Sequence, residues 1–216
     1  MTFSIGVRTV RREGADYLST FLSRLAEIGA TSHRDVLGVH ICDGTGLDIT
    51  ANENGCRAIE TALCDRPDWV MFLEDDVDPI NDLIGSVQRW MEDHERPGVH
   101  LYPLACQYSQ CFKPGATAWE YRTGAYYGSQ ALLLRASAAP SAINYVRTEW
   151  APHRGFDLAL ARWHESYAPE TTHLVTPVPC FVDHIGSVST LGCNVGRFAG
   201  FPGRDFSYQR AEVNVG

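Results

Sequence analysis

The sequence predicts an α/β protein in which helices flank a mostly parallel central sheet, in a single domain. Short apolar runs typical of strands alternate with segments whose apolar residues recur at helical spacing, as in βαβ units. The length of 216 residues is close to that of one domain. The composition, 44% hydrophobic and 20% charged, excludes disordered, collagen-like and coiled-coil chains.

The first third of the chain has the most regular pattern. Three predicted strands lie at residues 3–7, 36–42 and 69–73. Two predicted helices lie at residues 17–28 and 57–63, and Gly29 ends the first of them. This order of elements predicts parallel strands joined by helices.

The second half is less regular. Residues 125–135 contain a predicted strand, residues 157–166 a helix and residues 174–182 another strand. We expect residues 1–195 to form the domain, and the Gly-rich residues 196–216 to form a tail or a lid.

Polar loops follow the first three predicted strands, at residues 8–14, 43–46 and 74–79. In open α/β sheets, ligands bind beyond the carboxyl ends of the strands. We therefore expect the functional site where these three loops meet.

The third loop carries an acidic run, Glu74, Asp75, Asp76 and Asp78. Grouped carboxylates are unfavourable unless a cation neutralises them, and few carboxylates plus substrate phosphates commonly hold Mg²⁺ or Mn²⁺. The alternative is a solvated turn, with Asp78 and Pro79 starting the next helix.

A second candidate ligand is His184, which follows a predicted strand and precedes a Gly/Ser-rich loop with Ser187 and Ser189. Hydroxyl and backbone N–H groups of such a loop can hold phosphate oxygens, and the imidazole can bind a metal. A buried histidine bonded to a backbone carbonyl is the alternative.

Asp157 opens a predicted helix, so it is either an N-cap or a general base held at the cleft. Asp43 and Gly44 form either an ordinary turn or a nucleobase contact. A phosphatase of the haloacid-dehalogenase type is excluded, because Ile41 stands where the nucleophilic aspartate would be needed. Arg8, Arg11 and Arg12 either bind a diphosphate or form a solvated basic loop.

Several short blocks resemble the nucleotide-sugar-dependent glycosyltransferases of the GT-A (Rossmann-like) type. Glu74-Asp75-Asp76 resembles their D-x-D signature, and the order of Asp43-Gly44, residues 54–58 and the acidic run is similar to family 2. Residues 9–13 with 17–22, residues 73–77 and residues 181–192 resemble the GlcNAc-transferase IV (glycosyltransferase family 54) catalytic domain.

This resemblance implies a UDP-sugar donor, a Mn²⁺ or Mg²⁺ cofactor and inverting transfer to an acceptor hydroxyl. It assigns the metal to Asp76 and His184, and the role of general base to Asp157. It implies these donor-binding residues: Thr9, Arg11, Asp43, Arg57, Glu74, Asp75, Ser187 and Ser189. The acceptor would lie near Tyr127, Gly128, Ser129 and Gln130, although these residues also fit a plain strand with a bend. A glycan is the default acceptor, and a hydroxymethylated DNA base is the alternative.

Two other functions stay open, a metal-dependent phosphoester hydrolase and a non-catalytic module that binds nucleotide sugars or glycans. The net charge of −8 argues against a protein that coats nucleic acid. No apolar run is long enough for a membrane span, and the seven cysteines include no C-x-x-C pair. We therefore expect reduced thiols and a cytoplasmic protein.

Overall fold

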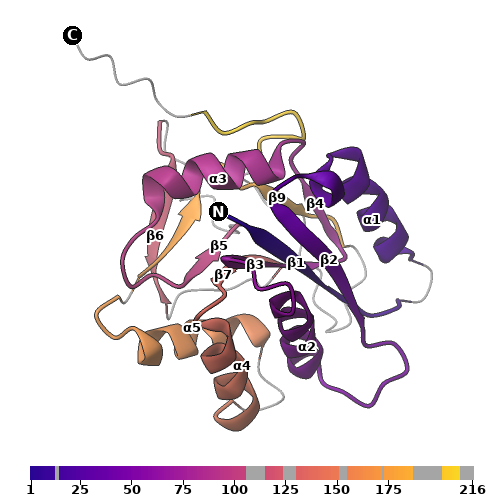
Figure 1. Ribbon diagram of the computed structural model, residues 1–216, viewed down its shortest axis with the longest axis vertical. Coiled ribbons are helices and arrows are strands. Elements are labelled where there is room, and N and C mark those ends of the chain that lie inside the picture. The colour runs from indigo at the N-terminus through magenta and orange to yellow at the C-terminus, as the bar shows by residue number, and fades with distance from the viewer. Residues whose placement is uncertain are drawn as a thin grey trace.

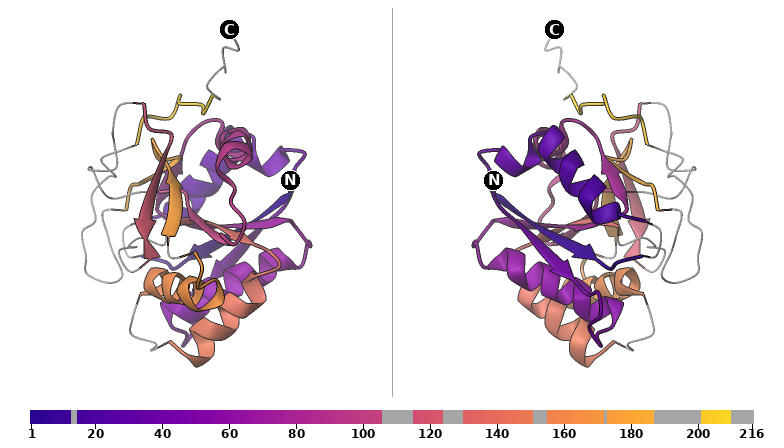
Figure 2. Two further views of the ribbon diagram at one scale, coloured as in Figure 1. Left: turned by 90° about the vertical axis from the view of Figure 1, so that its left-hand side faces the viewer. Right: turned by 90° about the vertical axis from the view of Figure 1, so that its right-hand side faces the viewer.

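In the computed structural model, helices cover both faces of a central sheet (Figure 1). The structure describes residues 1–12, 15–105, 115–123, 130–150, 155–171, 173–186 and 201–209. Figure 2 shows the same three layers from the two sides.

The central sheet has five strands in the order β2-β1-β3-β7-β5. Their bounds are Phe3–Thr9 (β1), Val36–Asp43 (β2), Trp69–Glu74 (β3), Leu101–Pro103 (β5) and Ala131–Arg135 (β7). β1 pairs in parallel with β2 and β3, whereas β7 pairs antiparallel with β3 and β5. Only β7 runs against the others in this sheet, so the prediction of a mostly parallel sheet is confirmed.

Two layers of helices enclose this sheet. Helices α1 (Tyr17–Glu27) and α3 (Leu83–His94) cover one face, and α2 (Ala51–Leu63), α4 (Ala139–Thr148) and α5 (Phe156–Tyr167) cover the other. A short 3₁₀ helix, η1 (Ala30–Ser32), follows α1. No described helix is long and apolar enough to cross a lipid bilayer.

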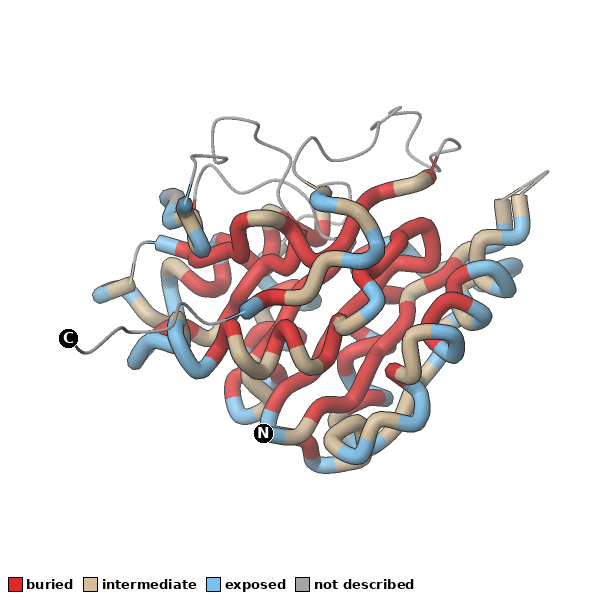
Figure 3. The backbone as a smooth tube through the Cα atoms, turned by 90° about the horizontal axis from the view of Figure 1, so that it is seen from above, coloured by how far each residue is buried: buried red, intermediate tan, exposed pale blue. Residues whose placement is uncertain are grey.

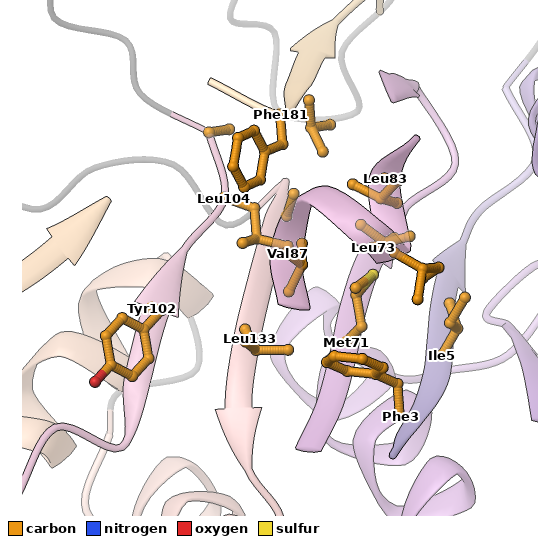
Figure 4. Close-up of a cluster of buried hydrophobic side chains, with 14 of the residues drawn as sticks. Phe3, Ile5, Met71, Leu73, Leu83, Val87, Tyr102, Leu104, Leu133 and Phe181 are labelled. Carbon is orange, nitrogen blue, oxygen red and sulfur yellow. The ribbon is translucent and has the colours of Figure 1, made fainter. Parts of the chain in front are cut away.

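Strand β3 is buried along its whole length, as Figure 3 shows for the centre of the sheet. Met71 and Leu73 point to the α1–α3 face, where they join the cluster drawn in Figure 4. Val70 and Phe72 belong to the second cluster, under α2, α4 and α5. Alternate side chains of one strand therefore reach two cores, which explains why its sequence is a continuous apolar run.

Two short ribbons lie beside the main sheet. β4 (Val77–Pro79) pairs antiparallel with β9 (Val182–His184), and β6 (Ala118–Arg122) pairs antiparallel with β8 (His173–Pro177). The single strand predicted at residues 174–182 is therefore two strands, separated by a segment with a cis Val178–Pro179 bond. Proline has no N–H to donate to a sheet, which is why the strand does not run through.

Two predicted helix starts are also wrong. Asp78 and Pro79 lie in β4, and the following helix begins at Leu83. Helix α2 begins six residues earlier than the predicted residues 57–63, because Thr50 caps it by accepting a hydrogen bond from Glu53 N (3.1 Å). Thr50-x-x-Glu53 has the residue spacing of a capping box, the signal that the periodicity argument missed.

Residues 201–209 pack on α3 and next to β4. Tyr208 is buried, its N–H donates to Ser86 Oγ (3.0 Å), and its hydroxyl donates to Asp93 Oδ2 (3.0 Å). This part of the predicted tail belongs to the packed structure, whereas residues 196–200 and 210–216 lie outside the described residues.

The described cysteines, Cys42, Cys56, Cys64 and Cys180, are free thiols. Burial raises the pKa of the Cys56 thiol to about 12, despite the charge of Arg147, so this thiol is protonated and inert at neutral pH.

Candidate active site

The carboxyl ends of β1, β2 and β3 meet at one edge of the sheet, because the strands are parallel and adjacent. Thr9 is the register partner of Asp43, and Arg8 is the register partner of Glu74. A cavity of about 910 Å³ opens at this edge. Its lining includes Thr9, Arg11, Arg12, Asp43, Thr45 and Asp75.

Four predicted donor-binding residues, Thr9, Arg11, Asp43 and Asp75, therefore line one cavity. Arg57 is not among the lining residues: it lies on α2, where its Nε donates to Glu53 Oε1 (3.1 Å). The structure thus brings together four residues that end or follow strands, and it leaves out Arg57 on a helix and Glu74 at the end of β3.

Backbone and side-chain hydrogen bonds fix the walls of this cavity. Thr45 N donates to Asp43 Oδ1 (2.8 Å), so Asp43 and Gly44 do form an Asx turn. Arg11 N donates to Thr45 Oγ1 (2.7 Å), which ties the first loop to the second. The carbonyl of Thr9 accepts from Gly44 N (3.0 Å) and from Asn54 Nδ2 (2.9 Å).

Asp75 and Asp76 share one arginine. The Thr9 hydroxyl donates to Asp75 Oδ2 (2.5 Å), and Arg12 Nη1 donates to Asp75 Oδ1 (2.7 Å). Arg12 Nη2 reaches Asp76 Oδ2 (3.2 Å). The cation that neutralises this part of the acidic run in the structure is therefore a side chain of the same chain.

The other two carboxylates have arginine partners as well. Glu74 Oε1 accepts from Arg8 Nη2 (2.5 Å), and Asp78 Oδ2 accepts from Arg204 Nε (2.8 Å). Arg24 Nε lies 3.2 Å from Asp78 Oδ1. The acidic run is a buried ion-pair network, so the alternative of a solvated turn is wrong.

His184 reaches this network from β9, where it is the register partner of Val77. Its Nε2 lies 3.4 Å from Asp76 Oδ2, and Ile185 N donates to the carbonyl of Asp76 (2.9 Å). Gly186 packs against the same carboxylate, since a Cβ at this position would lie 2.4 Å from Asp76 Oδ2. The two predicted metal ligands are thus neighbours.

Two observations bear on whether Asp76 can bind a cation. Burial would raise the pKa of Asp76, but the His184 hydrogen bond and the Arg12 charge outweigh it, so the pKa is lowered and the group is ionised at neutral pH. Asp76 Oδ1 is buried and has no hydrogen-bond partner among the described residues. An ionised carboxylate with one uncommitted oxygen beside an imidazole fits a divalent cation. Among the described residues, no three His, Cys, Asp or Glu side chains form a complete metal site, so phosphate or water oxygens would have to complete it.

Asp157 lies at the start of α5, where Gly155 is the N-cap, so the N-cap interpretation of Asp157 is wrong. Its Oδ1 accepts a hydrogen bond from Leu158 N (2.8 Å). The preceding Phe156 packs on Phe72 of β3, with 5.3 Å between ring centroids. This contact packs the start of α5 on β3, and Asp157 itself does not line the cavity.

Of the predicted acceptor residues, the structure describes only Gln130, whose carbonyl accepts from Glu74 N (2.9 Å). Gln130 Oε1 is buried, and no described residue is its hydrogen-bond partner. Tyr127, Gly128 and Ser129, and the donor-loop residues Ser187 and Ser189, lie outside the described residues.

Sequence reasoning missed the partners of the acidic run. It left Arg8 and Arg12 open between a diphosphate site and a solvated basic loop, whereas the structure pairs them with Glu74, Asp75 and Asp76. The clustering of three arginines within five residues was the only signal, and it carries no information about partners more than 60 positions away.

Comparison with known proteins places the fold in a class. No protein-family model matches the chain, and no curated protein sequence matches it. Among solved structures, the chain is similar to a glycosyltransferase involved in the glycosylation of the major capsid of PBCV-1. The TM-score is 0.54 and the identity 12%, over 88% of this chain and 95% of that chain.

S. aureus TarS matches with a TM-score of 0.51 and 12% identity, over 83% of this chain and 35% of that chain. A Drosophila β1,4-galactosyltransferase 7 mutant in complex with manganese, UDP-Gal and xylobiose matches less well, with a TM-score of 0.40 and 12% identity, over 65% of this chain and 51% of that chain. The first two similarities show that the fold is of the GT-A type. The relation to GlcNAc-transferase IV stays a prediction.

Proposed function

We propose that this protein is a metal-dependent glycosyltransferase that moves a sugar from a UDP-sugar to an acceptor hydroxyl with inversion. The observation that carries the proposal is the ionised Asp76, one of whose buried oxygens has no hydrogen-bond partner in the described part of the chain. His184 lies beside it, next to a cavity at the carboxyl edge of a GT-A type sheet. A glycosyltransferase with the same fold supports it.

The cavity offers suitable partners for a nucleoside diphosphate. Asp43 and Thr45 supply oxygen acceptors and a hydroxyl at the outer turn, which suits the polar edges of uracil and ribose. Arg11 lines the same cavity and supplies charge-assisted hydrogen bonds for the phosphates. We propose Ser187 and Ser189 as further phosphate contacts. Thr9 and Asp75 line the cavity and would lie beneath the donor.

Asp76 and His184 would hold Mn²⁺ or Mg²⁺. When bound there, the cation stabilises negative charge on the leaving UDP as a Lewis acid. Glu74 does not face the cavity in this arrangement, since Arg8 holds its carboxylate. We therefore propose that Glu74 stabilises the carboxyl ends of β1 and β3 through its ion pair with Arg8.

Asp157 is the proposed general base. Its carboxylate would take the proton of the acceptor hydroxyl as the oxygen attacks the anomeric carbon. A glycan hydroxyl is the proposed acceptor, held near residues 127–130. Transfer to a DNA base would instead weaken steeply as salt rises, because phosphate contacts release counterions, whereas transfer to a neutral glycan would not.

The proposal is tested by calorimetric titration of UDP, in Mn²⁺ and in EDTA, on the wild type and on Asp76→Asn. We expect binding that requires Mn²⁺ and that is lost in the variant. Asp82→Asn is the matched control, because Asp82 is a half-exposed carboxylate that pairs with Arg89 outside the cavity. Absence of UDP binding to the wild type in both conditions would refute the uridine assignment.

Product analysis separates the three functions. A transferase that turns over without acceptor releases UDP and free sugar, and water attacks the anomeric carbon, so UDP formed in H₂¹⁸O carries no label. A phosphoester hydrolase that cleaves the sugar–phosphate ester by attack at phosphorus releases the same products, but its UDP carries the water oxygen. A binding module binds UDP and releases neither. Mass spectrometry of the UDP formed from a UDP-sugar with the protein and Mn²⁺ in H₂¹⁸O therefore gives a different result for each.

A further inference from the structure

The guanidinium of Arg12 lies between the carboxylate of Asp75, which lines the cavity, and the neighbouring carboxylate of Asp76. It contacts Asp75 Oδ1 at 2.7 Å through Nη1 and Asp76 Oδ2 at 3.2 Å through Nη2. Only 9% of the Arg12 side chain is exposed, and 3% and 6% of the two aspartate side chains. The three groups form a compact buried ion cluster.

Two buried carboxylates this close need a positive charge, because their mutual repulsion and their loss of hydration are both unfavourable. A guanidinium suits the task, since its planar fork can contact two carboxylates at once. In this structure, Arg12 supplies the positive charge that a divalent cation would otherwise supply.

A cation held by Asp76 and His184 conflicts with this arrangement. Asp76 Oδ2 lies 3.2 Å from Arg12 Nη2 and 3.4 Å from His184 Nε2, so a cation bound between Asp76 and His184 would lie next to the guanidinium. Like charges at a few ångströms repel strongly in a site shielded from water. Arg12 and the cation therefore compete for the same carboxylate.

The cavity offers a second position for the Arg12 guanidinium. It lines the cavity together with Arg11, and its guanidinium carbon lies 5.0 Å from the centroid of the Tyr17 ring, which also lines it. A guanidinium that leaves the aspartates can stay over this ring and meet a diphosphate in the same space.

We infer that Arg12 is a tethered counter-ion of Asp75 and Asp76, which a divalent cation displaces and which then binds the diphosphate of the donor. This inference rests on the proposed function. It assigns Arg12 two successive anionic partners, the aspartates before the donor complex forms and the diphosphate after it.

The inference predicts opposite effects of one substitution on two affinities. In Arg12→Gln, Mn²⁺ alone should bind about tenfold more tightly than in the wild type, if Arg12 covers the site in nine of ten wild-type molecules. UDP at saturating Mn²⁺ should bind about tenfold more weakly, because a charge-assisted contact to the diphosphate is lost. A residue that only supports the fold would weaken both.

Free Mn²⁺ is measured by electron paramagnetic resonance during titration of the protein, and UDP binding by calorimetry. Arg11→Gln is the matched control for the metal titration, since it removes the same charge from the same cavity. Among the described residues, no ion pair joins Arg11 to a carboxylate. It should change the Mn²⁺ affinity by at most about twofold, because water and salt screen an exposed charge.

Arg12→Lys is the second variant, for the case that the glutamine variant does not fold. A compact ammonium keeps the charge but does not bridge two carboxylates, so Mn²⁺ should bind more tightly than in the wild type, though less tightly than in Arg12→Gln.

Unchanged or weaker Mn²⁺ binding in the folded Arg12 variants, with metal-dependent UDP binding by the wild type intact, would overturn the inference and leave the proposed function standing. If neither the wild type nor the variants bind Mn²⁺ with or without UDP, both the inference and the metal-dependent function are refuted.

Discussion

Arg8 and Glu74 are register partners at the carboxyl ends of β1 and β3, and Arg8 Nη2 donates to Glu74 Oε1 at 2.5 Å. The guanidinium carbon of Arg8 also lies 5.7 Å and 5.9 Å from the ring centroids of Phe72 and Phe156. The ion pair therefore joins the ends of β1 and β3. The contact with the Phe156 ring joins them to the start of α5, the helix that carries Asp157.

Arg8→Gln should lower the free energy of unfolding by about 2–3 kcal/mol, because it removes the arginine from a carboxylate that is 10% exposed. Arg57→Gln is the control: its pair with Glu53 is more exposed, and Glu53 keeps Arg147, so the loss should stay below about 1 kcal/mol. Urea unfolding of both variants measures the difference. Equal losses of unfolding free energy in the two variants would show that the Arg8–Glu74 pair stabilises the fold no more than the exposed Arg57–Glu53 pair does.

Gly186→Ala should weaken Mn²⁺-dependent UDP binding at least about tenfold, since the new Cβ would lie 2.4 Å from Asp76 Oδ2 and would push the carboxylate aside. Gly6→Ala makes an equally close contact, 2.4 Å from the carbonyl oxygen of Ala58, but away from the cavity. We expect Gly6→Ala to lower the unfolding temperature and to leave the UDP affinity of the folded protein unchanged. Calorimetry with circular dichroism separates these effects, and a UDP affinity unaffected by Gly186→Ala would contradict the metal assignment.

Asp157→Asn should reduce the rate of sugar transfer about 10²- to 10⁴-fold and leave UDP binding unchanged, because an amide does not accept the acceptor's proton. The amide oxygen can still accept from Leu158 N, so the helix start is preserved. Asp82→Asn is the control at another helix start, because Asp82 is the N-cap residue of α3 and does not line the cavity. The test compares the steady-state transfer rates of the wild type and the two variants with the same UDP-sugar. A similar rate loss in both variants would remove the specific role of Asp157.

Stability should fall with acid through His164, which is fully buried on α5. Burial, helped by the neighbouring His100, lowers the pKa of His164 to about 4. Between about pH 6.5 and 4 the unfolded chain then binds a proton at this residue that the folded protein does not, so stability decreases as the pH falls through this window.

Through His164, the free energy of unfolding should fall by about 2 kcal/mol as the pH is lowered from 7 to 4.5. His164→Gln should remove it, since glutamine does not titrate and can still accept from His100 N, as His164 Nε2 does at 3.2 Å. Urea unfolding of both proteins at the two pH values gives the difference. An identical pH dependence would show that His164 does not titrate as described.

The predictable part of the fold is the part with strong local pattern. The strands around residues 3–7, 36–42 and 69–73 and the helix at residues 17–28 are confirmed to within two residues at each end. Apolar periodicity and a helix-ending glycine with φ of +69° are properties of a few consecutive residues, and local sequence is enough to reveal them.

Elsewhere, contacts between distant segments overrode the local pattern. Asp78 and Pro79 have the composition of a helix start, yet pairing with Val182 and Asp183 makes them part of a strand. A partner strand supplies hydrogen bonds that no local propensity anticipates, and it lies more than 100 residues away along the chain.

The sequence by itself determined that carboxylates, arginines and a histidine follow strand ends, because residue identity and alternation of elements are written in the chain. Only the tertiary structure decided which of them pair: Arg12 with Asp75 and Asp76, Arg8 with Glu74, and His184 with Asp76. The physical reason is that an ion pair depends on distances of a few ångströms. Those distances are set by strand register and by the β4–β9 ribbon rather than by spacing along the chain.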